Sequence, residues 1–356
     1  MKKIAVIHNL TSGGAVRVLD ETNKILSRKY SIKIFSPPKG KFSEGGPPQK
    51  VWKYLYYVYK TLPAYYRRIS REINKGKYHA VIIHPDTYLK APFALLYLTV
   101  KSIYILHEPP REFYEPLCFH APLAKDKLFS ILRIPVAILD KISSRRASYI
   151  VVNSKFSKNK IDKIYGVKSK VIYPGITSKL VKMRGNIKRK TFCLSVGSLL
   201  PYKGHELTIE AIGMMSKKPQ LVVVGNGRET ENDNLNELAI KNGVKLKIFE
   251  KVSDKELNEL YLSAKVYINS AYQEPFGLAS LEALNSGENL VTVDEGGTQE
   301  LKKFFGDKVM VVNRTSKSIS KGINKMINVR NSFSHPQAIF DWSYYVEELD
   351  KLIQDD

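Results

Sequence analysis

Short apolar runs alternate with helical patterns in the first half of the chain. The runs are rich in Val and Ile and are bounded by polar or turn-forming residues, while residues 15–26 repeat apolar positions at helical spacing. Continuous β-branched runs of this kind are typical of strands that are buried on both faces, as in a parallel sheet. The strands expected here are residues 4–7, 32–35, 80–83, 102–106, 149–152 and 170–172.

The second half repeats this alternation after a stretch, residues 177–190, in which the pattern dissolves into Ser, Lys, Arg and Gly. This stretch is the expected linker, so we divide the chain into residues 1–180, residues 190–335 and a terminal helix within 336–356. Two consecutive series of this type predict an α/β fold of two Rossmann-like, doubly wound domains facing a cleft. The further strands expected are 192–196, 221–224, 245–249, 266–269 and 290–293, with helices at 205–215, 235–241, 254–263 and 278–285.

Composition agrees with two folded domains and points to a reducing compartment. The chain has 356 residues, of which 43% are hydrophobic, and this is enough to bury two cores. Its two cysteines cannot form a disulfide framework. A secretory signal is not expected, because His8 and Asn9 interrupt the first apolar stretch. We therefore expect a cytoplasmic protein, with a peripheral position at the inner face of the cell membrane as an option.

The net charge of +23 favours anionic partners. Much of the excess lies in residues 50–77, where eight basic residues accompany a single acid, Glu72, and seven Trp and Tyr residues are interspersed. Basic residues mixed with aromatic ones suit an anionic membrane surface, and they would also suit single-stranded nucleic acid. The third interpretation is an amphipathic helix that buries its apolar stripe and turns its lysines to water.

Two glutamates, Glu274 and Glu282, flank a turn at the carboxyl end of an expected strand, where ligands of open α/β sheets bind. Pro275 and Gly277 indicate a tight turn before a helix, whose N terminus carries free amides and a partial positive charge that suit a pyrophosphate. One carboxylate can then meet a sugar while the other accepts hydrogen bonds from a ribose. The alternative is a helix with an acidic N-terminal residue and a solvated glutamate. The amides expected to point into the cleft are those of Phe276, Gly277 and Leu278.

Glycine-containing loops and one lysine follow other expected strands. Gly13 and Gly14 open a helix and would allow a phosphate or sugar to approach the backbone, and Gly225 would do the same for a nucleobase. Lys203, on a short loop, can neutralise a leaving diphosphate. Plain turns and a surface lysine are the alternatives. The chain contains no Asp-x-Asp pair and no cluster with metal-ligand spacing, so neither a metal nor another cofactor is expected.

Among the seven histidines, His107 is the candidate for the reacting site, because it ends an expected strand and is followed by a loop. His8 and His84 also lie near strand ends. Any of the three could instead be a core histidine with its hydrogen bonds satisfied.

These motifs together resemble the retaining glycosyltransferases of family 4, which have the two-domain GT-B fold. The resemblance extends over nearly the whole chain, and the glutamate block is its most specific part. It rests on Gly13-Gly14 with Arg17, His107-Glu108, Asn153 to Phe156, Tyr173 to Ile176, Gly197, Lys203-Gly204, Gly225 to Gly227, Val252 to Asp254 with Leu257, Glu274 to Gly277 with Glu282, and Gly296-Gly297 with Glu300.

The resemblance implies roles at one donor site. Glu274 would orient the donor sugar, with help from the amides of residues 276–278, and His107 would contact that sugar at the reacting face. The family's chemistry is metal-independent and retains the anomeric configuration, so an α-linked nucleotide sugar yields an α-glycosidic bond. The terminal helix would pack back on the N-terminal domain. Of the remaining donor-binding residues, Glu282 would bind the ribose and Lys203 the diphosphate, and the backbone at Gly14 would lie against the phosphates.

This sequence departs from the family pattern at two positions. Ser198 stands where the family usually has an arginine, so one cation for the diphosphate is missing. Glu250 stands near a position where the family tends to have glycine, which affects the nucleobase pocket.

The sequence therefore predicts a hexosyltransferase-type enzyme of class EC 2.4. It would move a sugar from a UDP- or GDP-sugar to a hydroxyl of a glycan or lipid-linked acceptor. The alternatives are a nucleotide-sugar epimerase of the same fold and a nucleic-acid-binding protein. The last of these rests on charge alone, so no nucleic-acid partner is expected.

Overall fold

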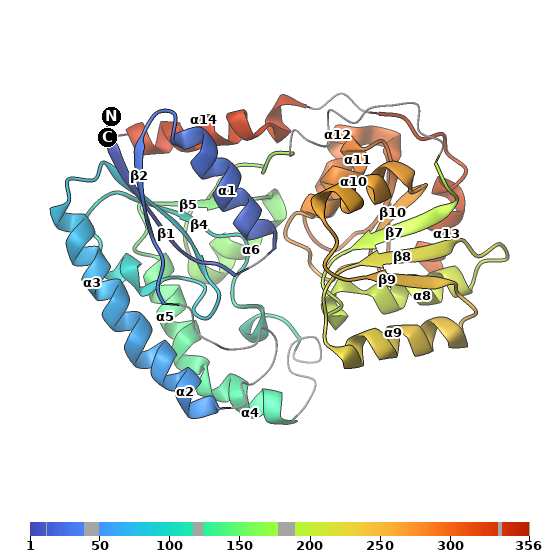
Figure 1. Ribbon diagram of the computed structural model, residues 1–356, viewed down its shortest axis with the longest axis horizontal. Helices are drawn as coiled ribbons and strands as arrows, with labels where there is room; N and C mark the ends of the chain where they lie inside the picture. The colour runs from blue at the N-terminus through green and yellow to red at the C-terminus, as the bar shows by residue number, and fades with distance from the viewer. Residues whose placement is uncertain (12, 39–49, 117–123, 177–188, 334–336, 356) are drawn as a thin grey trace. The chain divides into compact units, whose positions relative to one another are not determined.

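The computed structural model describes the chain except for residues 12, 39–49, 117–123, 177–188, 334–336 and 356. The described residues form two compact units (Figure 1). Unit 1 comprises Met1–Gly175 and Trp342–Asp356, and unit 2 comprises Ile176–Asp341. The predicted linker, residues 177–190, lies almost wholly outside the described residues. No helix in the described parts of the chain combines the length and the apolar character that crossing a membrane requires.

Unit 1 is built on a six-stranded sheet in which neighbouring strands are parallel. Its order, β2-β1-β3-β4-β5-β6, is that of a doubly wound fold, in which the chain starts inside the sheet and proceeds to both sides. The strands are β1 (Lys3–Asn9), β2 (Ser31–Phe35), β3 (Ala80–Asp86), β4 (Ser102–Ile105), β5 (Tyr149–Val152) and β6 (Lys170–Val171).

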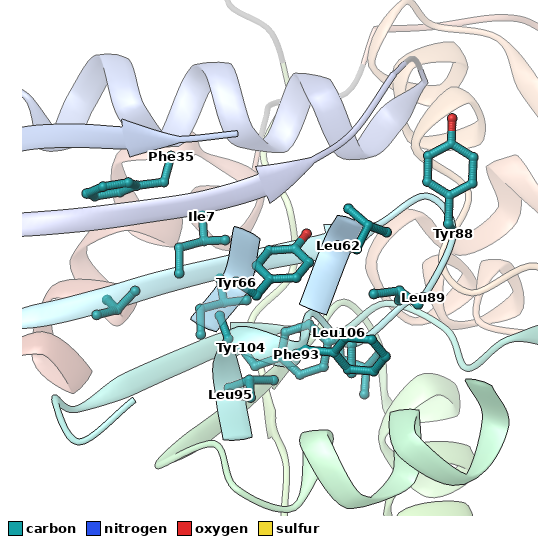
Figure 2. Close-up of a cluster of buried hydrophobic side chains, with 14 of the residues drawn as sticks. Ile7, Phe35, Leu62, Tyr66, Tyr88, Leu89, Phe93, Leu95, Tyr104 and Leu106 are labelled. Atoms are coloured by element: carbon teal, nitrogen blue, oxygen red, sulfur yellow. The ribbon is translucent and has the colours of Figure 1, made fainter. Parts of the chain in front are cut away.

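Helices cover both faces of this sheet. Ile7 belongs to a core shared with α3 (Leu62–Lys75), and Figure 2 shows Leu62 and Tyr66 of that helix among its members. The preceding residue in the strand, Val6, belongs to the opposite core, which contains side chains from α1 (Gly14–Leu26). Burial on both faces explains why the strands read as continuous apolar runs in the sequence.

Most of the remaining helices of unit 1 belong to the segments that connect one strand to the next along the chain. α6 shows how the sequence sets helix ends: Ser154 Oγ accepts a hydrogen bond from Ser157 N (2.9 Å), and Gly166 ends the helix in a left-handed conformation. The helices are α2 (Val51–Tyr56), the π-helical turn η1 (Tyr57–Thr61), η2 (Phe93–Leu96), η3 (Arg111–Phe113), α4 (Ala124–Leu132), α5 (Ile134–Ser144) and α6 (Lys155–Tyr165).

The basic, aromatic segment of residues 50–77 forms the continuous helical stretch α2-η1-α3. Tyr54, Tyr57 and Tyr66 are buried in the core, whereas Trp52 and Tyr56 are 66% and 64% exposed. The segment is thus an amphipathic helix that also presents two aromatic side chains to its surroundings.

Unit 2 repeats the plan with a second six-stranded parallel sheet, in the order β12-β11-β10-β7-β8-β9. The two sheets confirm the predicted doubly wound α/β class. β12 is an addition, because the sequence analysis expects no strand there. The strands are β7 (Phe192–Val196), β8 (Gln220–Val224), β9 (Leu246–Phe249), β10 (Val266–Asn269), β11 (Asn289–Val293) and β12 (Val309–Val312).

The helices of unit 2 connect these strands. α9 begins at Glu229, ahead of the expected start at residue 235, because the backbone N–H of Arg228 donates to Glu231 Oε2 (2.7 Å) and caps an extra turn. The helices are η5 (Pro201–Lys203), α8 (His205–Gly213), α9 (Glu229–Lys241), α10 (Asp254–Ser263), α11 (Leu278–Asn285), η6 (Thr298–Glu300), α12 (Leu301–Phe305), η7 (Gly306–Lys308), α13 (Ser316–Met326) and η8 (Ala338–Phe340).

The terminal helix α14 (Trp342–Gln354) belongs to unit 1, although the chain reaches it from unit 2. Leu349 and Ile353 are fully buried in the same core as Val18 and Leu26 of α1. The aromatic rings of Trp342 and Tyr345 are buried in that core as well. The last residues of the chain therefore complete a core that the first residues begin.

We expect Leu349→Ala to lower the free energy of unfolding of unit 1 by about 2–5 kcal/mol, because it leaves a cavity between α14 and α1. Both tryptophans of the chain lie in unit 1, so tryptophan fluorescence during urea unfolding reports this unit alone. Glu347→Ala, on the exposed side of the same helix, is the control and should change that free energy by under about 0.5 kcal/mol. Equal midpoints for the two variants would contradict the packing described.

Candidate functional site

Loops at the carboxyl edge of the unit 2 sheet bring two of the predicted site residues into direct contact. Lys203 Nζ lies 2.6 Å from Glu274 Oε2, so the lysine that follows β7 pairs with the glutamate that follows β10. Both side chains are mostly buried, with 21% and 17% of their surfaces exposed. A partly buried pair of this kind is screened less than a surface pair. The structure thus joins two motifs that lie far apart in the sequence.

The loop after β7 holds Lys203 in place. It contains η5, and the stem of Lys203 runs over Gly197, where an added Cβ would lie 3.3 Å from Lys203 Cδ. Ser270 Oγ donates to the carbonyl oxygen of Gly204 (2.6 Å), and Tyr272 N donates to the carbonyl oxygen of Tyr202 (2.7 Å). These bonds tie the lysine loop to the segment that leads to Glu274.

The backbone of Glu274 is itself held by the loop after β11. Glu274 forms a bridge with Gly296, and Gly297 N donates to the carbonyl oxygen of Glu274 (2.7 Å). A Cβ on Gly296 would lie 2.6 Å from that oxygen, and the residue has φ +106°. Only glycine allows this approach without strain. The Gly296-Gly297 pair therefore holds the backbone of Glu274 in position by direct contact.

Phe276 and Gly277 form the turn that starts α11. Phe276 is buried against Phe340, with ring centroids 6.1 Å apart, and its carbonyl oxygen accepts a hydrogen bond from Thr298 Oγ1 (3.1 Å). Gly277 has φ +86°, and a Cβ there would lie 2.6 Å from the same Thr298 Oγ1. Leu278 is the first residue of α11, and no side chain caps that helix start. The first-turn amides have no partner within their own helix, so they suit an anion.

Glu282 points inward from α11. It is 4% exposed, and its Oε2 accepts a hydrogen bond from the hydroxyl group of Tyr261 (3.0 Å). This burial excludes the alternative of a solvated glutamate. Tyr261, on α10, is a site residue that the sequence analysis missed, since nothing in a helical pattern distinguishes a partner tyrosine from a core tyrosine.

Gly225 follows β8 and packs against the lysine loop. An added Cβ would lie 1.7 Å from the carbonyl oxygen of Gly197, so the position has no room for a side chain. The close approach of the Gly197 backbone explains why residue 225 is a glycine. Its expected place under a nucleobase stays a prediction.

In unit 1, Gly13 and Gly14 are exposed at the start of α1. Gly13 has φ +86°, and a Cβ there would meet nothing within 4 Å, so the backbone at this turn is open. The adjoining Ser12 lies outside the described residues.

His107 follows β4, also in unit 1. Its two ring nitrogens are buried, and neither has a hydrogen-bond partner among the described residues. Burial lowers the pKa of His107 to about 4, with Glu108 opposing the shift and Lys90 adding to it, so the ring is neutral at pH 7. His84 is wholly buried with a pKa lowered to about 3, and its ring nitrogens also lack a hydrogen-bond partner among the described residues, whereas His8 accepts a hydrogen bond from Leu10 N. His107 stays the candidate of the three.

Unit 1 thus contains the candidates Gly13, Gly14 and His107, and unit 2 contains the other predicted site residues. Among the described residues, no group of three or more His, Cys, Asp or Glu side chains is arranged to bind a metal ion. The meeting of the unit 1 residues with those of unit 2, and the metal-independent chemistry, stay predictions.

One further cation lies near this edge of unit 2. Arg314 follows β12; its Nε donates to the carbonyl oxygen of Ser270 (3.0 Å), and its guanidinium lies 5.4 Å from the centre of the Tyr272 ring. Burial lowers the pKa of Arg314, and Glu295 opposes the shift. The sequence analysis missed Arg314 because it expected no strand before it.

Comparison with known proteins agrees with these motifs. Residues 11–179 match the family described as Glycosyltransferase Family 4, and residues 179–337 match Glycosyl transferases group 1. An uncharacterised glycosyltransferase of Methanocaldococcus jannaschii, MJ1607, is 27% identical over 210 residues, which are 53% of each chain. Spore coat protein SA of Bacillus subtilis is 21% identical over 313 residues, covering 81% of this chain and 78% of that protein.

Solved structures show the same fold. The structure of Anabaena Alr3699/HepE in complex with UDP and glucose matches with a TM-score of 0.70 and 16% identity, covering 100% of each chain. At this identity the likeness concerns the fold.

We expect Gly277→Ala to destabilise unit 2 by about 2–4 kcal/mol, because the new Cβ is strained at positive φ and also collides with Thr298 Oγ1. Gly243→Ala is the matched control in the same unit: its φ is +61°, but the nearest atom to a Cβ is Nζ at the end of the Lys218 side chain, at 3.3 Å. This control should cost about 1 kcal/mol. Chemical denaturation followed by circular dichroism measures both, and equal losses would show that the tight contact is unimportant.

Proposed function

The chain belongs to the family 4, or group 1, glycosyltransferases, and on that premise we propose that it transfers one sugar from a UDP- or GDP-sugar to a hydroxyl group of a glycan or lipid-linked acceptor. The anomeric configuration is retained, the new bond is α-glycosidic, and no metal takes part. The observation that carries this proposal is the contact between Lys203 and Glu274 beside the start of α11. No observation favours the epimerase or nucleic-acid alternatives over transfer.

Lys203 stabilises the leaving group. As the bond from the anomeric carbon to the diphosphate oxygen breaks, negative charge grows on the diphosphate. A lysine and the amides at a helix N terminus, both fixed before the reaction, stabilise that charge without further reorganisation. The pairing with Glu274 supports this role, because it holds the ammonium group against the segment that leads into α11.

Glu274 has two tasks in this proposal. It holds Lys203, and its carboxylate accepts hydrogen bonds from hydroxyl groups of the donor sugar. The backbone contacts from Gly296 and Gly297 support the second task, because they fix the backbone position from which the Glu274 side chain extends. Such preorganisation is effective only when the supporting residues are themselves rigid.

The missing arginine at Ser198 leaves Lys203 as the principal side-chain cation for the diphosphate. We assign Arg314 a positioning role, because its contacts with Ser270 and Tyr272 brace the segment that precedes Glu274. The amides of residues 276–278 contribute the rest of the positive potential.

Glu282 and His107 complete the donor contacts. The carboxylate of Glu282 accepts hydrogen bonds from the ribose hydroxyls, and the bond from the Tyr261 hydroxyl, which fixes its orientation, supports this. His107 is neutral at pH 7, and neither ring nitrogen has a hydrogen-bond partner among the described residues, so one N–H can donate to a hydroxyl of the donor sugar. Gly14 offers exposed backbone to the phosphates, and Gly225 lies under the base.

The complex of the Anabaena protein with UDP and glucose supports a uridine nucleotide as the first donor to test. A thermal-shift comparison of UDP, GDP and their sugars ranks them, since a ligand that binds only the folded protein raises its Tm.

We expect Lys203→Ala to weaken binding of UDP, or of GDP if that nucleotide ranks first, by roughly 10- to 100-fold, because a charge-assisted bond to the diphosphate is lost. Isothermal titration calorimetry measures the Kd. Lys218→Ala is the control, since that lysine of unit 2 bonds the carbonyl oxygen of Asn242 at the end of α9. An unchanged Kd in Lys203→Ala would remove the lysine from the diphosphate site.

Replacing Glu274 and replacing Glu282 should have different effects on kcat and on the donor Kd. Glu274→Gln should lower kcat by about 100-fold or more with little change in donor Kd, because its contacts with the sugar matter most in the transition state. Glu282→Gln should instead raise the donor Kd. Nucleotide release in the presence of an acceptor panel gives kcat, and isothermal titration calorimetry gives the donor Kd. Wild-type rates in both variants would refute the site.

A further inference from the structure

We propose that unit 1 docks on a lipid bilayer containing anionic lipid, through an apolar face on α4 and α5 that continues onto α2. This face makes no use of the donor-binding residues, so the proposal stands or falls separately from the transfer reaction.

On α4 and α5 the exposed side carries large apolar side chains and polar groups are buried in the protein interior, which is the reverse of an ordinary helix at a water-facing surface. Arg133 is 9% exposed and Asp140 is 1% exposed, whereas aliphatic side chains on the opposite side are 42–63% exposed. These outward residues are Leu128, Ile131, Leu132, Ile134, Ile138 and Ile142.

Hydrogen bonds hold the helices in this orientation. Asp140 accepts from the hydroxyl of Tyr165 (2.5 Å) and from Ala91 N (2.9 Å). Arg133 donates to Glu112 Oε1 (2.8 Å) and to the carbonyl oxygen of Tyr88 (3.0 Å). Rotating either helix to bury its isoleucines would leave these polar groups without partners, which costs more than exposing an apolar side chain. The apolar face is therefore a stable feature of the folded unit.

The face continues onto α2. The hydroxyl of Tyr59 donates to the carbonyl oxygen of Leu132 (2.8 Å), and the rings of Tyr54 and Phe129 lie 5.0 Å apart, so α2 packs beside α4 (Figure 1). Trp52 and Tyr56 of α2 are exposed as well, so this neighbouring helix adds two aromatic side chains to the exposed apolar groups of unit 1. Such amphipathic rings prefer the headgroup level of a bilayer.

Charge identifies the occupant as an anionic membrane. Lys53, Lys60, Lys127 and Arg146 lie exposed on or beside these helices. Among the described side chains of α2, η1, α4 and α5, the single acid is Asp140, which is buried. A second copy of the chain would bring the same basic rim against this one, and the chain carries a net charge of +23. A bilayer with anionic headgroups accepts both the cations and the aliphatic side chains.

The geometry suits a helix pair that lies in the interface. α4 has nine residues and α5 has eleven, whereas a spanning helix needs about 20. Interfacial helices bury one apolar face at the level of the headgroups and upper acyl chains. This position would bring unit 1 to the surface where a lipid-linked acceptor is found.

Co-sedimentation of the full chain with vesicles tests the proposal. We expect binding to phosphatidylcholine vesicles that contain phosphatidylglycerol, and at least tenfold weaker partitioning for Ile131→Gln/Ile138→Gln, since two side chains no longer leave water. Met214→Gln/Ile240→Gln is the matched control, because these two apolar residues of unit 2 are 62% and 80% exposed. Lys53→Gln/Lys60→Gln should weaken partitioning about fivefold per charge removed.

Tryptophan emission supplies an independent readout. The chain has two tryptophans, and Trp342 is 5% exposed, so a blue shift on adding vesicles reports Trp52. Trp52→Phe should abolish the shift while retaining most of the binding.

Three outcomes would overturn the proposal: equal binding to vesicles of phosphatidylcholine alone, unchanged binding of Ile131→Gln/Ile138→Gln, or self-association without vesicle binding that this variant abolishes. The last would identify the face as an interface between copies. Lys203→Ala should bind vesicles as the unaltered chain does, and the isoleucine variant should keep its affinity for UDP. The failure of either proposal is thereby distinguished from failure of the other.

Discussion

Close approach of backbone segments at the carboxyl edge of the unit 2 sheet is the constraint on which the candidate site depends. The loop after β11 lies so close to Glu274 that Gly296 has no room for a side chain, and Gly277 is similarly confined by Thr298. Interiors packed to this density resist small displacements. The loops therefore hold Glu274 and Lys203 in contact with little freedom to move apart.

The charges of the site follow from this arrangement. A buried or half-buried carboxylate next to a lysine is stable only when both are paired, and here the two are 2.6 Å apart. In the proposed reaction, the donor diphosphate brings negative charge to a lysine that a carboxylate has already positioned. In the proposed reaction, helix α11 contributes its N-terminal amides to the same diphosphate.

Unit 1 uses polar groups differently. There Arg133 and Asp140 face inward and anchor α4 and α5, so isoleucines that would ordinarily enter a core face outward. The arrangement satisfies buried hydrogen bonds at the expense of exposed apolar area. In water this is tolerable but unfavourable, and at a bilayer surface it becomes favourable.

The sequence by itself determined the doubly wound α/β class and the candidate site residues, because parallel strands buried on both faces and glycine turns leave strong local patterns. It did not determine that Lys203 contacts Glu274, that Tyr261 bonds Glu282, or that Arg314 braces the segment before Glu274. It also left open which face of residues 124–146 is buried. Contacts between residues far apart in the chain, and the rotation of a helix about its axis, depend on partners that a local pattern does not contain. Only the tertiary structure decides them, since hydrogen bonds from distant strands and helices set which side chains meet.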